Sequence, residues 1–189
     1  MQSNTRVSNE GYANGALGLP GAGAGMLELV ESKDFGSAAT SYTFSGLDGD
    51  TDEVYVLVFR VKKAVASAMN IELQPNAATT NQVSSGHFAG PSGASGVLNN
   101  TTLRLMEDGD ATNGNISAGV AVIEAKTGIL RTMRCQWTVA LASPAVYSAH
   151  FAGVWNETAT NITSLVFIAS QTNGIGTGSY ARLYKLLKA

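Results

Sequence analysis

The sequence predicts an all-β protein: an antiparallel two-sheet β-sandwich, jelly-roll-like, with a flexible glycine-rich N-terminal arm. From residue 26 onward, short apolar segments with a period of two alternate with turn-forming segments, at the spacing typical of sandwiches and barrels. Neighbouring strands differ in length, and no repeat of about 20 to 50 residues suggests a propeller or solenoid. The length of 189 residues suits one main hydrophobic core.

The chain divides into an arm of residues 1–25 and a β-sandwich domain of residues 26–189. The arm contains six glycines and Pro20 with few large apolar side chains. Such a segment cannot offset its own ordering entropy, roughly 1 kcal/mol per residue or more. Two interpretations stay open: a disordered terminus, or an arm that becomes ordered on a neighbouring subunit.

The strongest predicted strand covers residues 53–62. Valines occupy positions 54, 56 and 58, and Tyr, Leu, Phe and Val occupy positions 55, 57, 59 and 61, so both faces are apolar. We therefore expect a central strand, in which Asp at either Val56 or Leu57 abolishes folding. A hairpin is predicted around residues 126–128. Further strands are predicted at residues 26–30, 41–44, 69–74, 101–106, 119–125, 129–142, 146–155, 163–170 and 179–187.

Residues 76–100 are rich in Asn, Thr, Ser and Gly, with His87, Phe88 and Pro91 among them. This composition predicts a long loop. Because a loop of that length inside a compact domain is usually functional or mobile, it is a candidate contact segment.

The charge of the chain excludes some partners. The net charge of −2 and the pI near 5.6 provide no strong attraction to phosphates, so no direct nucleic-acid partner is expected. Charged residues make up only 14% of the chain, against about 25% in an average protein. A surface with so few charges is expected to be covered by neighbouring subunits.

Compartment and thiol chemistry follow from two further observations. No apolar stretch reaches the roughly 18 residues of a membrane span, and the N-terminus lacks a secretory-signal pattern, so no membrane partner is expected.

The single cysteine, Cys135, cannot form an intrachain disulfide. It shares a strand face with Met133, Trp137 and Val139, which predicts a buried, unreactive thiol.

Asp48, Asp50 and Asp52 resemble the opening of an EF-hand calcium loop. Glu53 stands where that loop needs glycine, and Phe59 stands where it needs a bidentate acid. A solvated turn is therefore the favoured interpretation, with a different kind of calcium site at the three aspartates as the open alternative.

Catalytic motifs are not found. The glycine-rich segments 21–25 and 174–178 lack the strand, helix and lysine of a phosphate-binding loop. Residues 90–94 lack the last glycine of a nucleophile elbow. His87 and His150 have no partners at metal-ligand spacing. We predict no enzyme, no catalytic residue, no metal and no cofactor, although a spatial pair of carboxylates in a small hydrolase stays open.

Tyr147, Phe151 and Trp155 share one face of a predicted strand. Such a stripe is typical of a core or subunit interface, which is the favoured interpretation. The alternative is a platform on which sugar rings stack.

Three segments carry a resemblance to a known class. They are residues 27–31 leading to 42–47, the strand at 54–58, and residues 162–167 followed by 176–186, where a glycine-rich turn leads into a last strand with Leu183 and Tyr184. Over most of residues 26–187 the chain resembles bacteriophage virion structural proteins: β-sandwich modules of capsid-decoration, head-fibre or tail accessory type. The resemblance implies a homo-oligomer, which we expect to be a trimer, attached to other virion proteins such as the major capsid protein. It carries over no catalytic residue.

The sequence therefore predicts a non-enzymatic phage virion protein, a capsid-decorating (cement) or fibre subunit, made in the host cytoplasm and located in the virion. The alternative is a tail-associated receptor-recognition module that binds a cell-surface glycan. Capsid and tail locations both stay open.

Overall fold

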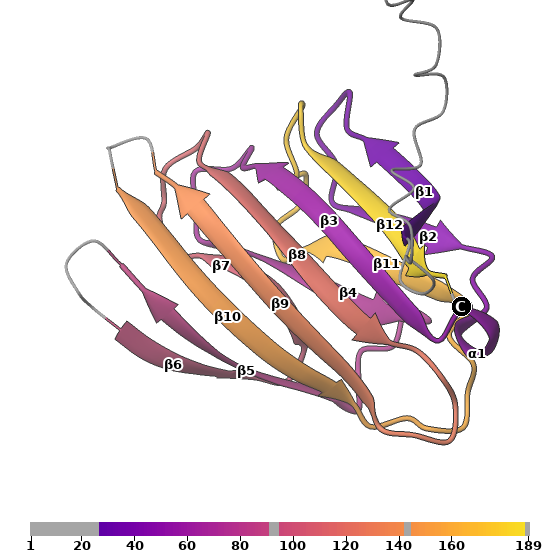
Figure 1. Cartoon of the computed structure of the whole chain (residues 1–189). Helices are drawn as coiled ribbons and strands as arrows, with labels where there is room; N and C mark the ends of the chain where they lie inside the picture. Colours follow the sequence, from indigo (N-terminus) through magenta and orange to yellow (C-terminus); the bar gives the residue numbers. More distant parts are fainter. Residues whose placement is uncertain (1–26, 91–94, 142–144, 188–189) are drawn as a thin grey trace, which may run out of the picture.

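The computed structural model describes residues 27–90, 95–141 and 145–187, so the predicted arm of residues 1–25 lies outside the described residues (Figure 1). The described chain forms twelve strands and one short helix. The elements are β1 (Leu27–Asp34), β2 (Ser41–Ser45), α1 (Gly49–Asp52), β3 (Val54–Lys62), β4 (Met69–Pro75), β5 (Gln82–Ala89), β6 (Ser95–Asn100), β7 (Leu103–Asp108), β8 (Ile116–Glu124), β9 (Arg131–Ala140), β10 (Val146–Trp155), β11 (Ser164–Ala169) and β12 (Tyr180–Leu186).

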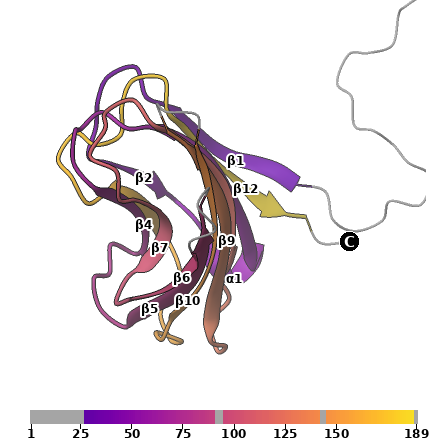
Figure 2. The same cartoon turned by 90° about the vertical axis from the view of Figure 1, so that its left-hand side faces the viewer.

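The predicted two-sheet antiparallel sandwich is confirmed. A large sheet has the order β1-β12-β3-β8-β9-β10-β5-β6, and a small sheet has the order β2-β11-β4-β7. Figure 2 shows the two sheets as facing, curved layers. Among the described residues no helix is long and apolar enough to cross a membrane.

The strand pairing follows the jelly-roll pattern. β1 pairs with β12, β2 with β11, β3 with β8, and β4 with β7, so strands from the two ends of the chain pair first and later pairs lie progressively inside. The contacts of β12 with β3 and of β11 with β4 join these pairs into the two sheets. Eight strands thus wrap as a double Greek key.

Four further strands, β9, β10, β5 and β6, extend the large sheet beyond this jelly roll. The hairpin of β8 and β9 was predicted and is confirmed, with Gly128 in the left-handed region at φ 79° between the strands. β10 then pairs with β9 on one side and β5 on the other, and β6 forms the outer edge.

The prediction of a long loop at residues 76–100 is wrong, because most of this segment forms β5 and β6. The inward residues of β5 are small or polar, so its sequence does not show the alternation of apolar and polar residues that marks a half-buried strand. Gln82 and Ser84 are buried and donate hydrogen bonds to the backbone oxygens of Ala78 (2.6 Å) and Thr102 (2.7 Å). Gly86 lies against the ring of Phe151, where a Cβ atom would approach within 2.1 Å.

β3 lies inside the large sheet between β12 and β8, as its two apolar faces predicted. Tyr55, Leu57 and Phe59 point into the core and are at most 1% exposed. Phe59 contacts Phe167 of the opposite sheet, with ring centroids 5.8 Å apart. The valines on the other face point away from the small sheet and are only half-buried.

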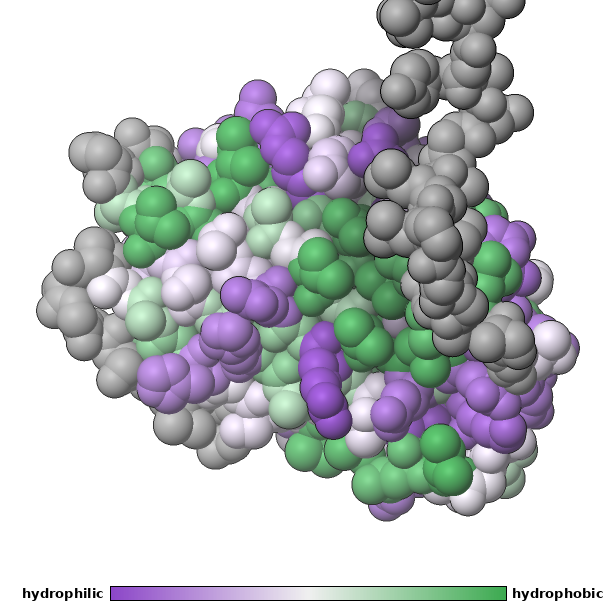
Figure 3. All heavy atoms as spheres, viewed as in Figure 1, coloured by the Kyte–Doolittle hydropathy of each residue, from purple (hydrophilic) through white to green (hydrophobic). Residues whose placement is uncertain are grey.

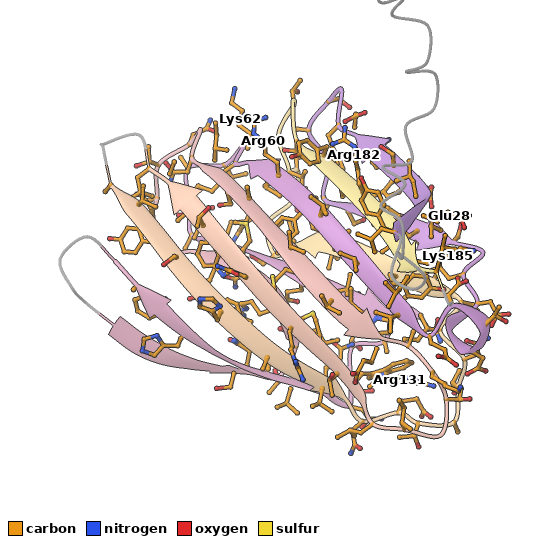
Figure 4. The ribbon with its side chains drawn as sticks, viewed as in Figure 1. Glu28, Arg60, Lys62, Arg131, Arg182 and Lys185 are labelled. Carbon is orange, nitrogen blue, oxygen red and sulfur yellow. The ribbon has the colours of Figure 1, made fainter. Side chains whose placement is uncertain are left out.

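Arg131 holds the loops at the lower end of the large sheet, where Figure 4 labels it. Its guanidinium donates to the backbone oxygens of Lys126 (3.3 Å) and Thr160 (2.6 Å) and also to that of Glu157. The guanidinium carbon lies 4.9 Å from the ring centroid of Trp155. Desolvation lowers the pKa of Arg131, but an arginine stays charged at neutral pH.

Candidate functional site

The side of the large sheet that faces away from the core carries a continuous apolar surface, which we call the outer apolar face. Strand register places its members side by side: Leu29 opposite Tyr184, Tyr184 opposite Val56, and Val56 opposite Val122. Figure 3 shows hydrophobic residues gathered over the middle of this sheet. The outer apolar face consists of Leu27, Leu29, Val54, Val56, Val58, Val120, Val122, Tyr184 and Leu186.

The outer apolar face is open to solvent across the part of the chain that the structure describes. Leu29 is 50% exposed, Val120 44% and Val122 41%. Single exposed apolar side chains are ordinary, but a contiguous patch on a sheet face marks an interaction surface. A role as an interaction surface also explains why the outer positions of β3 are apolar, although no second layer covers them in the described structure.

A charged rim borders one side of the outer apolar face (Figure 4). Arg182 pairs with Asp34 at 3.5 Å. Arg60 donates to the backbone oxygen of Gly178 at 3.0 Å. An apolar centre with a polar rim is the usual anatomy of a protein interface.

On its other side the outer apolar face continues into a shallow depression over β8, β9, β10 and β5, lined by Val120, Val122, Arg134, Gln136, His150 and His87, among others. His87, which the sequence predicted in a loop, lies instead on β5, directly opposite His150 of β10. Across the described ranges no group of three or more His, Cys, Asp or Glu residues could hold a metal ion.

The three aspartates of the possible calcium loop do not share one centre. They form a short helix, α1, whose N-cap is Asp48. Each carboxylate accepts a hydrogen bond from a different residue: Asp48 from Thr51 (2.7 Å), Asp50 from Thr127 (2.7 Å) and Asp52 from Tyr55 (2.8 Å). The bonds from Thr51 and Asn161 lower the pKa of Asp48, and the bond from Thr127 lowers the pKa of Asp50. The arrangement is that of a capped turn.

Cys135 is buried at 3% exposure, as predicted, and its Sγ lies 3.2 Å from the backbone oxygen of Leu105. Desolvation raises the pKa of the thiol well above its ordinary value, so the reactive thiolate is scarce at neutral pH. We expect a thiol reagent such as DTNB to leave the native protein unlabelled and to label one thiol per chain in denaturant. Rapid labelling without denaturant would contradict this.

The aromatic stripe on β10 belongs mainly to the core. Phe151 and Trp155 are 2% and 4% exposed, and Phe151 stacks on Trp137 with ring centroids 6.5 Å apart. The favoured core interpretation is confirmed for these two residues, and the three-residue sugar platform is wrong. Tyr147, at the start of β10, is only half-buried.

Tyr147 instead borders a cleft of about 460 Å³ between the sheets, which we call the intersheet cleft. Residues from four strands or their ends form it, β5, β7, β9 and β10, so no local pattern predicted it. Its lining comprises Phe88, Glu107, Asp108, Gly109, Asp110, Trp137, Val139, Leu141 and Tyr147.

The carboxylates of the cleft are already engaged. Glu107 pairs with Arg104 at 2.6 Å, and Asp108 pairs with Lys63 at 3.1 Å. Hydrogen bonds from Asn115 and Thr112 lower the pKa of Asp110. A glycosidase acid needs a raised pKa instead, so Asp110 does not suit that role.

No protein-family model, curated protein or solved structure matches this chain. The jelly-roll assignment rests on the strand pairing alone.

Proposed function

We propose that this protein is a non-enzymatic structural subunit of a bacteriophage virion, a capsid-decorating or fibre protein that self-associates and docks on the particle. The observation that carries the proposal is the outer apolar face with its charged rim. A jelly roll that presents an apolar sheet side gains stability by packing that side against another copy, because burial removes apolar area from water.

Two further observations support this proposal. Only 14% of the residues are charged, which suits a chain whose surface is largely covered in an assembly. The jelly-roll pairing is one that viral capsid domains use, which is an argument by analogy of fold and carries less weight than the surface itself.

The virion partners follow from the resemblance seen in the sequence. The protein associates with itself, as a trimer, and docks on other virion proteins such as the major capsid protein. The arm of residues 1–25 holds it to the particle or to a neighbouring subunit. Removal of this arm should leave the melting temperature unchanged and weaken attachment.

The direct test is the oligomeric state of a double variant, Val120→Glu with Val122→Glu. Both side chains are exposed, so the monomer should fold, whereas two carboxylates buried at a subunit contact should weaken association by more than about tenfold. Light scattering after size exclusion should show the wild type as an oligomer and the variant shifted toward monomer.

Val83→Glu is the matched control. Val83 is a 54% exposed valine on β5, on the same side of the large sheet as Val120 and Val122 but separated from β8 by β9 and β10, and its substitution should leave the mass unchanged. A wild-type protein that is monomeric at all concentrations, or a double variant with wild-type mass, would overturn self-association through this face.

A further inference from the structure

The intersheet cleft lies where the end of β7 meets the inner side of β9, β10 and β5. Its volume of about 460 Å³ is within the range of small-molecule sites and exceeds what one or two waters need. Two half-buried aromatic rings, Phe88 and Tyr147, lie at its border. The ring of Tyr147 packs on Gly90, where a Cβ would approach its Cε1 within 2.4 Å, so the backbone holds this ring in place.

Trp137 gives the cleft an unused hydrogen-bond donor. The residue is 3% exposed, and its indole Nε1–H has no hydrogen-bond partner. Buried polar groups are nearly always paired, so an unpaired donor on a residue that lines the cleft leaves its acceptor to be supplied by a ligand or water. Stacking on Phe151 fixes the orientation of the indole.

The opposite wall offers acceptors. Glu107 and Asp110 line the cleft, and hydrogen bonds from Asn115 and Thr112 favour the ionised form of Asp110. An ionised carboxylate only accepts hydrogen bonds. A ligand that fills the cleft must therefore donate to this wall, accept from Trp137 and present an apolar surface to the aromatic rings.

We propose that the intersheet cleft binds the pyranose ring of a neutral sugar. Sugar hydroxyls both donate and accept hydrogen bonds, and the C–H face of a pyranose packs on aromatic rings. A quaternary ammonium would suit the rings and carboxylates but would leave the indole N–H unpaired. An acidic sugar would be repelled by the carboxylates. Glycan binding was the alternative function that the sequence left open. The intersheet cleft would be the sugar site, in place of the platform of three aromatic residues on β10.

The test uses methyl glycosides of glucose, galactose and N-acetylglucosamine as probes, added to the full-length protein. The two tryptophan indole N–H groups give two signals in a ¹H–¹⁵N spectrum. At least one probe should shift the Trp137 signal and leave the Trp155 signal in place. A ligand of about thirteen non-hydrogen atoms is expected to bind with a Kd on the order of 1 mM. Glucuronic acid should produce no shift.

Two variants separate binding from folding. Trp137→Phe removes the N–H donor but keeps an aromatic ring against Phe151, and Tyr147→Ala removes the ring at the border. Each should weaken probe binding by about tenfold or more, measured for both variants on the backbone amide signal of Val139, which lines the cleft and does not depend on the Trp137 indole. Tyr180→Ala, which makes the same change on the opposite side of the large sheet, should not alter binding. The spectrum of each variant shows whether its fold is kept.

Three outcomes would overturn the proposal: no probe shifts the Trp137 signal, tetramethylammonium shifts it where no sugar does, or Tyr147→Ala binds the probes as the wild type does. The readout does not depend on oligomeric state. A sugar-binding monomer would count against the structural role alone, and an oligomer without sugar binding would count against the cleft alone.

Discussion

Replacing Leu57 with Asp is expected to prevent folding. Leu57 is fully buried in the middle of β3, at 0% exposure, and no cation lies on the core face of the strand beside it. Burying an unpaired carboxylate there costs an amount comparable with the whole free energy of unfolding, about 5–15 kcal/mol. Circular dichroism and tryptophan fluorescence should show an unfolded or insoluble chain.

Val56→Asp is the matched comparison, one residue away on the same strand. The sequence predicted that this change also abolishes folding, and the structure corrects that prediction, because Val56 lies half-buried on the outer apolar face. The variant should fold, with a lower melting temperature, and should self-associate less well. If Val56→Asp also fails to fold, the outer apolar face must be covered within a single chain.

The second large effect is expected for Lys63→Met. Lys63 and Asp108 form an ion pair at 3.1 Å in which both side chains are 1% exposed. Lys63 also donates to the backbone oxygen of Asp110, and Asn115 donates to both aspartates. Removal of the lysine leaves a buried carboxylate without its cation, which costs about 3–5 kcal/mol. Urea unfolding should show the loss as a lower midpoint with an unchanged slope.

Lys126→Met provides the control for this ion pair. Lys126 pairs with Glu53 at the surface, where its side chain is 52% exposed, so solvent screens the interaction and the midpoint should not change measurably. A double change of Lys63→Met with Asp108→Leu should recover part of the loss, since no unpaired charge remains. A Lys63→Met midpoint equal to that of Lys126→Met would contradict the buried-pair argument.

Periodicity predicted the strands whose inward residues are apolar. β3 and the hairpin of β8 and β9 were found in this way, and so was the burial of Cys135. β5 was missed because its inward positions are Gln82, Ser84 and Gly86, which are stabilised by hydrogen bonds and close packing. Such positions become recognisable as inward only once their partners in other strands are known.

The sequence by itself determined the fold class and most of the core, because the side chains of a strand alternate between faces within the strand itself. Only the tertiary structure decided which face of β3 is covered, that His87 lies opposite His150, and that Lys63 meets Asp108. It also brought Phe88, Trp137 and Tyr147 to one cleft. These outcomes depend on strand order and register, which join residues far apart in the chain and leave no trace in local periodicity.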